Sequence, residues 1–328
     1  MVKIGVIGLG GIAGAHLAAY KRYPEGARIV AAADGKGKDA YSFGMLPEGA
    51  RLYTDYREML EKEELDAVDI CAPSHLHRAI SEYALRSGVH VLCEKPMALS
   101  SEDAESMVSV ARETGKVLMC AQIIRFASAY AYLRETVKSG VLGKPVQFNF
   151  TRLSAIPRWR LGSNGQNSAA NGGVMFDLSI HDVDYVYSLF GEPEAISGIY
   201  RPEREGGPDD FFTATLGYKG FTVTVNGGFF EAEIAFNREF YAVFEKGDLR
   251  LCRDGKLLLS GEELDVRDII YPGEIKGLNI ELSSCFVDEI GHFISCVEAR
   301  KESEIASPES TAGGIKLAKR IIDSLERI

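Results

Sequence analysis

The sequence predicts an α/β fold in two domains: a doubly wound parallel sheet over residues 1–122, and an α+β domain with a largely antiparallel open sheet over residues 123–328. Two observations lead to this prediction. Up to residue 122, short apolar runs alternate with helical patterns, as in right-handed crossovers between parallel strands. Beyond that point, β-rich and often alternating runs are separated by turns that contain glycine.

Composition and charge restrict the class of protein. Hydrophobic residues make up 46% of the chain and charged residues 26%, which is typical of globular domains. The formal charge is −10, from 37 basic and 47 acidic residues, and no block of lysines and arginines occurs. We therefore expect neither nucleic acid nor a membrane surface as a partner. We also find no signal peptide pattern and no apolar run long enough to cross a bilayer.

The six cysteines are scattered along the chain and form no Cys-x-x-Cys pair. Several lie inside apolar runs, which is typical of reduced and buried thiols. This pattern predicts a cytoplasmic protein. Because the cysteines also lack zinc spacing, we expect no metal site.

A glycine-rich turn follows the first expected strand and opens a helix over residues 12–21. Its pattern, G-x-G-x-x-A, is typical of a Rossmann domain, in which the helix amino terminus binds the pyrophosphate of a dinucleotide. Gly8 permits the tight turn, and Gly10 lets the backbone approach the phosphates. The residues expected to contact the cofactor here are Gly8, Leu9, Gly10, Gly11 and Ile12.

The second expected strand, residues 28–33, ends in an acid. Asp34 lies about 20 residues beyond the turn, where a carboxylate can accept a hydrogen bond from the ribose 2′-hydroxyl. A carboxylate there repels a 2′-phosphate, so we expect NAD as the cofactor. Lys36 and Lys38 bring two cations nearby, which keeps NADP possible.

A lysine stands at the carboxyl end of a later strand, expected over residues 89–93. Pro96 ends this strand, and the bond before it can be cis, which would fix the direction of Lys95. Ligands of such sheets bind at the carboxyl ends of the strands. The alternative is a solvated lysine in a turn.

Two histidines follow the strand expected over residues 67–72. His75 and His77 lie near where a cofactor would extend, and a contact with cofactor or substrate competes with a packing or capping role. The histidines without such a context, which we interpret as structural, are His16 and His90.

In the second domain, two glycines precede an expected helix that runs to about residue 190. Asp177 and His181 are four residues apart and so share one face of this helix. A carboxylate beside an imidazole suits acid–base chemistry. Such pairs also occur as plain surface pairs, but the glycines before them would allow close approach of a ligand, which favours a functional role.

Arginines and the only tryptophan surround this region of the sequence. Trp159 and Arg160 form either a lip that stacks on a sugar or a partly buried loop anchor. If Arg125, Arg152 and their neighbours cluster near the site, an anionic substrate such as a uronate or nucleotide sugar becomes plausible. In the alternative, these arginines pair with acids elsewhere.

Together these residues resemble the Gfo/Idh/MocA family, which includes glucose–fructose oxidoreductase, inositol dehydrogenase and rhizopine-pathway proteins. The resemblance covers almost the whole chain. Its marks are Gly8–Ala13 with Asp34, Tyr53–Tyr56, Ala72–Pro73 with His77, Glu94–Pro96, Gly172–Gly173 with Asp177 and His181, and Phe286–Phe293. Two departures lie around the expected substrate: Gln122 stands where many members have Asn, and only two glycines follow Asn171.

The resemblance implies a Rossmann domain joined to an α/β domain whose open sheet often forms the oligomer interface, so we expect a homo-oligomer, a dimer or a tetramer. It also implies that Lys95 bonds the reacting hydroxyl, that His181 is the general base and that Asp177 holds the substrate or the imidazole. The further cofactor contacts that it implies are Ala72, Pro73, His75, His77, Glu94, Lys95 and Gln122. The substrate contacts are Lys95, Arg125, Trp159, Arg160, Asp177 and His181.

The expected function is that of an NAD(P)-dependent oxidoreductase, which transfers hydride between nicotinamide and a secondary alcohol or ketone of a polyol, sugar or sugar derivative. Three alternatives stay open. The protein is a nucleotide-sugar or uronate dehydrogenase, a glycosidase or epimerase that uses redox chemistry transiently, or a non-catalytic sensor of sugar or cofactor.

Overall fold

The computed structural model describes residues 1–157, 172–202, 210–271 and 282–328. Residue contacts divide the chain into two compact units: Met1–Phe126 with Asp268–Ala312, and Ala127–Arg267 with Gly313–Ile328. The division at Phe126 lies close to the expected one, but the second domain expected over residues 123–328 is not continuous. The reason is helix α8 (Ser284–Ala299), which packs against α1 (Gly11–Tyr20) and β1 (Val2–Ile7) of the first unit.

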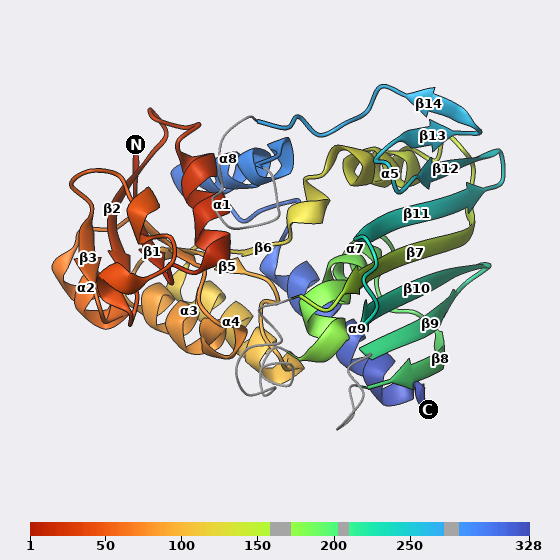
Figure 1. The fold of residues 1–328 in the computed structure, drawn as a ribbon, viewed down its shortest axis with the longest axis horizontal. Helices are drawn as coiled ribbons and strands as arrows, with labels where there is room; N and C mark the ends of the chain where they lie inside the picture. The colour runs from red at the N-terminus through yellow and green to blue at the C-terminus, as the bar shows by residue number, and fades with distance from the viewer. Residues whose placement is uncertain (158–171, 203–209, 272–281) are drawn as a thin grey trace. The chain divides into compact units, whose positions relative to one another are not determined.

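The first unit contains a sheet of six parallel strands in the order β3-β2-β1-β4-β5-β6 (Figure 1). Its chain order reverses between β1 and β4, which is the topological switch point of a Rossmann fold. The predicted doubly wound sheet is therefore confirmed. The strands after β1 are β2 Ala27–Ala33, β3 Arg51–Tyr53, β4 Ala67–Ile70, β5 His90–Glu94 and β6 Leu118–Ala121.

Helices with clear capping signals connect these strands. Ser100 accepts a hydrogen bond at its Oγ from the amide of Asp103 (3.1 Å), as its sequence position at the start of α4 predicts. The shorter helix α2 is also capped by a side chain, since Asp55 accepts from the amide of Arg57. The remaining bounds are α2 Tyr56–Lys62, α3 His77–Arg86, α4 Ser101–Thr114, η1 Gly37–Asp39, η2 Phe43–Met45, η3 Ser74–Leu76 and η4 Ile123–Arg125.

The second unit contains a sheet of nine strands in the order β14-β13-β12-β11-β7-β10-β9-β8-β15. Neighbouring strands are antiparallel except for β7 with β10 and β8 with β15, so the largely antiparallel sheet is confirmed. The bounds are β7 Pro145–Ala155, β8 Ala195–Arg201, β9 Asp210–Tyr218, β10 Phe221–Phe230, β11 Asn237–Phe244, β12 Gly247–Leu251, β13 Leu257–Leu259, β14 Glu262–Leu264 and β15 Glu326–Arg327.

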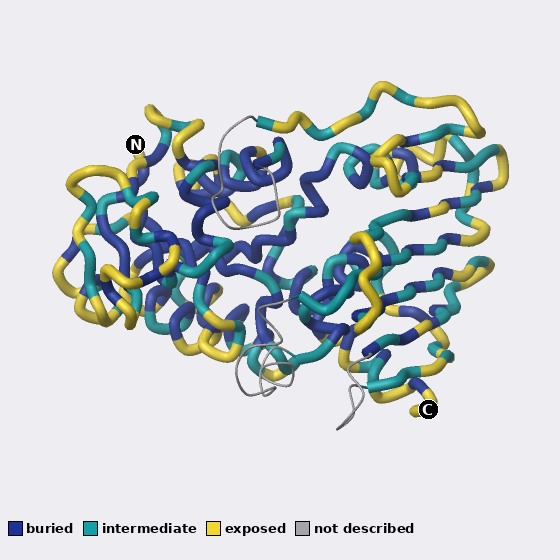
Figure 2. The backbone as a smooth tube through the Cα atoms, viewed as in Figure 1, coloured by how far each residue is buried: buried dark blue, intermediate teal, exposed yellow. Residues whose placement is uncertain are grey.

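Alternation along these strands separates a buried face from an open one (Figure 2). Phe148 and Phe150 of β7 are fully buried, and their rings pack against Phe190 and Tyr185 of α7 (Ile180–Phe190). Burying an aromatic ring of this size contributes about 2–3 kcal/mol. The other helices with residues in this unit are α5 Ser128–Ser139 and α9 Pro308–Ser324. Among the described helices, none combines the length and apolar character that crossing a bilayer requires.

Candidate functional site

The glycine-rich turn after β1 has the geometry that a dinucleotide requires. Gly8 has a φ of +89°, and a Cβ there would lie 2.7 Å from the carbonyl oxygen of Cys71, so any side chain would collide with the backbone after β4. A Cβ on Gly10, by contrast, would meet no heavy atom within 4 Å among the described residues. The turn is thus tight on its protein side and open at the amino terminus of α1, where a pyrophosphate fits.

Asp34 is held against this turn. Its Oδ2 accepts from the amide of Leu9 and its Oδ1 from the amide of Lys36, both at 2.8 Å. A carboxylate has about four lone-pair sites, so two remain for a ribose hydroxyl. Ser42 adds a contact that the sequence did not predict, because its hydroxyl donates to the carbonyl of Gly10 (2.7 Å) from a segment without clear periodicity.

The two histidines after β4 have different environments. His75 is exposed on η3. The ring of His77 is buried, with Nδ1 2.8 Å from the carbonyl oxygen of Pro96 and Nε2 2.8 Å from that of Ala72. Burial lowers the pKa of His77, and the two carbonyls oppose that fall. Both ring nitrogens lie at hydrogen-bond distance from the main chain, which fits the packing role of His77; the expected cofactor contact stays a prediction. Pro73 is exposed and Ala72 half-buried.

Lys95 follows β5 at the carboxyl edge of the parallel sheet, and its bond to Pro96 is cis. Its amide donates to Oε2 of Glu94 (2.8 Å). The other oxygen of this carboxylate, Oε1, lies 3.1 Å from Nε2 of His16. The lysine backbone is therefore fixed by a buried acid, and the acid in turn by a buried histidine.

His16 is the centre of a polar cluster that the sequence did not predict. Its Nδ1 lies 2.8 Å from Oδ2 of Asp69 on β4, and the Cys71 thiol lies 3.7 Å from the same nitrogen. Potential ligand atoms of these three residues lie within 4.8 Å of one another, a spacing that a metal ion could share. Both ring nitrogens of His16, however, already contact carboxylate oxygens at hydrogen-bond distance.

Two expected ligand contacts lie after β6. The side chain of Gln122 is fully buried, and no described group bonds to its amide oxygen or nitrogen. A buried amide in this state is one that a ligand or water satisfies. Arg125 is also buried, and its Nη1 donates to the carbonyl of Ile305 (2.9 Å) and to the hydroxyl of Ser310 (3.1 Å). These contacts anchor Arg125 within the first unit, and the substrate contact expected for it stays a prediction.

In the second unit, Asp177 lies in a π-helical turn, η5 (Met175–Ser179), and His181 lies in the first turn of α7. The expected helix is thus present, but its first turn is wider than an α-helix. Turns of this kind are frequent at functional sites. Both side chains are half-buried. Gly173 (φ +67°) precedes this turn, and its Cβ would lie 3.0 Å from Oδ2 of Asp210.

Asp210 anchors the start of this helix. It is almost fully buried on β9, and its Oδ2 accepts from the amide of Val174 (2.7 Å). This contact joins residues 36 apart in sequence. Its only sequence signal was an acid at the start of a β-rich run, which is too common to predict a cap.

Arg152, in the second unit, is bound to an acid of the same unit. Arg152 forms a buried ion pair with both carboxylate oxygens of Asp182, at 2.7 and 2.9 Å, and Tyr130 donates to the same carboxylate (3.3 Å). Burial lowers the pKa of Arg152, but the Asp182 charge outweighs this and raises it. The alternative, pairing with an acid elsewhere, is confirmed for Arg152. Trp159 and Arg160 lie outside the described residues.

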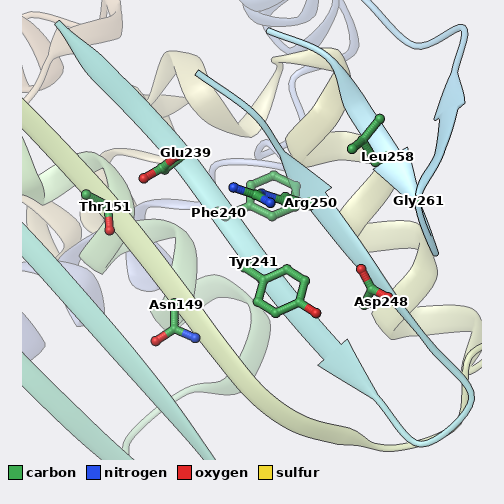
Figure 3. A pocket seen from close by; sticks show the side chains of 9 residues that line it. All are labelled: Asn149, Thr151, Glu239, Phe240, Tyr241, Asp248, Arg250, Leu258 and Gly261. Carbon is green, nitrogen blue, oxygen red and sulfur yellow. The ribbon is translucent and has the colours of Figure 1, made fainter. Parts of the chain in front are cut away.

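The open face of the second sheet carries a shallow hollow of about 440 Å³. Figure 3 shows its lining side chains, which come from β7, β11, β12 and the turn of β13 with β14. Asn149, Glu239, Asp248 and Arg250 give it a mixed polar and charged character. Asn149 and Thr151 alternate with Phe148 and Phe150 along β7 and so lie on the opposite, open face of the sheet, whereas Phe240 packs against Phe150 on the buried face.

Comparison with known proteins assigns the family. Residues 2–122 match the model described as "Oxidoreductase family, NAD-binding Rossmann fold", and residues 130–250 match the GFO/IDH/MocA C-terminal domain. The chain belongs to the GFO/IDH/MocA family. The expected resemblance and the NAD cofactor are therefore confirmed.

Relatives of this GFO/IDH/MocA chain include sugar and polyol enzymes. It is 31% identical to D-glucoside 3-dehydrogenase of Escherichia coli over 58% of this chain and 55% of that protein. It is 28% identical to levoglucosan dehydrogenase of Pseudarthrobacter phenanthrenivorans over 66% of this chain and 60% of that protein. These matches span little more than half the length of either relative. The structure of myo-inositol 2-dehydrogenase from Lactobacillus plantarum has the same fold, with a TM-score of 0.78, 22% identity, and coverage of 98% and 96% of the two chains.

Proposed function

We propose that this protein is an NAD-dependent dehydrogenase that oxidises a secondary alcohol of a cyclic polyol, sugar or sugar derivative. The observation that carries the proposal is the joint occurrence of an open dinucleotide turn at Gly10 and a fixed lysine backbone at the carboxyl edge of the same sheet. The relatives support the substrate class, because D-glucoside 3-dehydrogenase and myo-inositol 2-dehydrogenase are each named for dehydrogenation at one carbon of a glucoside or an inositol.

The residues of the first unit fit NAD. The pyrophosphate would lie at the amino terminus of α1, where Gly10 leaves open space, and the ribose would meet the Asp34 carboxylate. The buried amide of Gln122 offers a donor and an acceptor at the same edge of the sheet. Bound NAD supplies the hydride acceptor; the protein aligns the substrate and manages one proton.

In the proposed reaction, the carbinol carbon loses a hydride and its hydroxyl loses a proton, which leaves a ketone. Lys95 donates a hydrogen bond to the oxygen as negative charge develops on it. A fixed donor at such a position contributes about 3–4 kcal/mol. His181 takes the proton, and Asp177, which is four residues away in sequence, orients the imidazole or the substrate.

The anionic-substrate alternative has less support. Nη1 of Arg125 bonds to a backbone carbonyl and a hydroxyl, and Arg152 pairs with Asp182, so the described contacts of both guanidinium groups are with the protein itself. We therefore place neutral polyols and sugars ahead of uronates and nucleotide sugars.

The decisive experiment combines a substrate panel with two lysine variants. Polyols, sugars and nucleotide sugars are each mixed with NAD, and NADH formation is measured. Lys95→Ala is expected to lower kcat by about 10²–10³-fold on the substrate found. Lys138→Ala, at an exposed position on α5, serves as the control and keeps full activity. Full turnover by Lys95→Ala would show that the lysine role is wrong.

Two further outcomes test the other parts of the proposal. If His181 is the base, kcat rises with pH until the imidazole is deprotonated, and a pH-independent hydride-transfer step would contradict that role. Tight NAD binding without turnover on any substrate would instead favour the sensor alternative.

We also propose that the protein is a cytoplasmic homo-oligomer, a dimer or a tetramer, formed through the open face of the second sheet. All six cysteines are free thiols, which suits a reducing compartment. On the open face, Tyr241 is 41% exposed beside the mixed-charge hollow, which suits a contact with a second copy. Light scattering of the purified protein, compared with a Tyr241→Arg variant, tests this. A monomeric wild-type protein would refute it.

A further inference from the structure

The cluster around His16 links a helix and two strands of the first unit. His16 lies on α1 between two carboxylates, with Nδ1 2.8 Å from Asp69 of β4 and Nε2 3.1 Å from Glu94 of β5. The side chains of His16 and Asp69 are fully buried and that of Glu94 is 9% exposed. Ionised carboxylates only accept hydrogen bonds, so a hydrogen on each ring nitrogen would satisfy both contacts. The geometry therefore favours the imidazolium form of His16.

The charges of the cluster agree with this assignment. Burial lowers the pKa of His16, but the Asp69 charge and the hydrogen bond to it raise the pKa well above its ordinary value. Burial raises the pKa of Glu94, but the hydrogen bond and charge of His16 outweigh it and hold the pKa below its ordinary value. Burial also raises the pKa of Glu289, on α8, well above its ordinary value, which favours the uncharged form of this third acid.

The two oxygens of Glu94 make different contacts. Oε1 lies against the His16 ring, and Oε2 accepts from the amide of Lys95 at 2.8 Å. Because one planar carboxylate makes both contacts, rotation of the group toward one partner would lengthen the bond to the other. The position of the Lys95 backbone thus depends on a charge located on another element of the fold.

We propose that His16 is a positioning residue for Lys95, which acts by holding the Glu94 carboxylate in the orientation that binds the Lys95 amide. This inference rests on the proposed function, in which Lys95 donates to the reacting oxygen. It assigns His16 a role in the reaction without contact with substrate or cofactor. A displacement of about 1 Å at a reacting group can lower the rate about 10²-fold, so the energetic link is large enough to measure.

The first test uses His16→Gln. Its amide can donate to one carboxylate but carries no charge and cannot bridge two acids. We expect kcat to fall by about 10–100-fold while the Kd for NAD, measured by fluorescence, changes less than about threefold. His90→Gln is the matched control. His90 is also a buried histidine and lies on β5 at the end opposite Glu94, where its Nδ1 accepts from the amide of Val117 (2.9 Å). This control should lose stability but keep its kcat.

A double-mutant cycle separates positioning from general damage. In a Lys95→Ala background, His16→Gln should cause no further loss of kcat, because the group that it positions is gone. An equal loss in both backgrounds would overturn the proposal, and so would full kcat in His16→Gln. If His16→Gln does not fold, Glu94→Gln replaces it, since this variant keeps the shape of the side chain but loses the charge, and the same cycle is expected.

A third measurement does not depend on activity. The ¹⁵N spectrum of histidine-labelled protein at pH 8 should show both nitrogens of His16 protonated, and Glu94→Gln should abolish that signal. Full turnover by Lys95→Ala refutes the proposed function, whatever this spectrum shows. If Lys95→Ala loses its activity as expected but the spectrum shows a neutral His16, only the positioning role of His16 is wrong. One equivalent of bound metal that His16→Gln removes would also overturn it, because Asp69 and Cys71 would then share the ring with an ion.

Discussion

Glu289 is a carboxyl group inside the first unit, fully buried on α8, and no described group bonds to either of its oxygens. Burial alone raises its pKa well above the ordinary value, and the charges of Glu94 and Asp69 add to this, although that of His16 opposes it. The protein therefore keeps a proton on Glu289 that the unfolded chain releases above about pH 4.5.

This proton makes stability depend on pH. When the pKa of a group is higher in the folded state than in the unfolded chain, its contribution to the stability of the fold is fully present below the unfolded pKa. That contribution is lost as pH rises through the folded pKa. Glu289→Gln removes this term, so the variant should gain stability relative to wild type as pH rises above about 4.5, by up to about 1.4 kcal/mol per pH unit. Urea unfolding of both proteins from pH 5 to 8 checks this. If the free energies of unfolding of the two proteins differed by the same amount at every pH in that range, the raised pKa of Glu289 would be wrong.

At the scale of residues, the sequence predicted groups whose role follows from local pattern. The tight turn at Gly8 could be predicted because such a turn requires glycine at a fixed place after the strand, whereas the phosphate approach at Gly10 and the ribose contact of Asp34 stay predictions. His16 could not, because its partners lie 53 and 78 residues away on two other strands. The periodicity of apolar residues within a helix or strand does not indicate contacts between residues so far apart in the sequence.

At the scale of elements, the β1–α1 turn offers two glycines with opposite requirements. Gly8→Ala must adopt a φ of +89° and place Cβ 2.7 Å from the Cys71 carbonyl oxygen, so we expect a stability loss greater than about 2 kcal/mol. Gly10→Ala meets nothing within 4 Å in the described residues, and its φ is −73°, so stability should change by less than about 0.5 kcal/mol.

Although Gly10→Ala should hardly change stability, we expect it to weaken NAD binding. The new methyl group of Gly10→Ala occupies the space next to the helix amino terminus, and NAD affinity should fall at unchanged stability. Thermal unfolding and NAD titration of each variant provide the measurements. Equal NAD affinity in Gly10→Ala and wild type would exclude the pyrophosphate from this turn.

Helices and strands with a clear periodicity of apolar residues could be predicted from the sequence, but their local geometry could not. Phe286, Ile290, Phe293 and Val297 recur at helical spacing on α8, and all four are buried. The π-helical turn at Asp177 was not predicted, since an extra residue per turn hardly changes an apolar pattern. Strands β3, β13, β14 and β15 have two or three residues each, too few to show alternation.

At the scale of the whole molecule, the fold class could be predicted because each sheet follows from repeated local signals. The grouping of Asp268–Ala312 with the first unit could not. The apolar stripe of α8 specifies that the helix is covered, but it does not specify by which part of the chain. That depends on the shapes of α1 and β1, which α8 contacts across more than 250 residues of sequence.

Binding of NAD should stabilise the whole chain. At a concentration 100 times its Kd, a ligand that binds only the folded state adds about 2.7 kcal/mol. We expect NAD to raise the Tm more than NADP at equal concentration, because the Asp34 carboxylate repels a 2′-phosphate. Asp34→Asn keeps the shape but not the charge, and should narrow the ratio of the two Kd values by about tenfold. An unchanged ratio would mean that Asp34 does not face the ribose.

The distribution of the thiols has a practical consequence. Five of the six cysteines are buried, and burial, with the charge of Asp69, raises the pKa of Cys71 to about 12, so its reactive thiolate is scarce at neutral pH. Cys252 is the one that is partly exposed, two residues beyond Arg250 of the open sheet face. A maleimide dye should therefore attach at a single position in the unmodified protein. Its fluorescence would then report directly on whether a second copy covers that face.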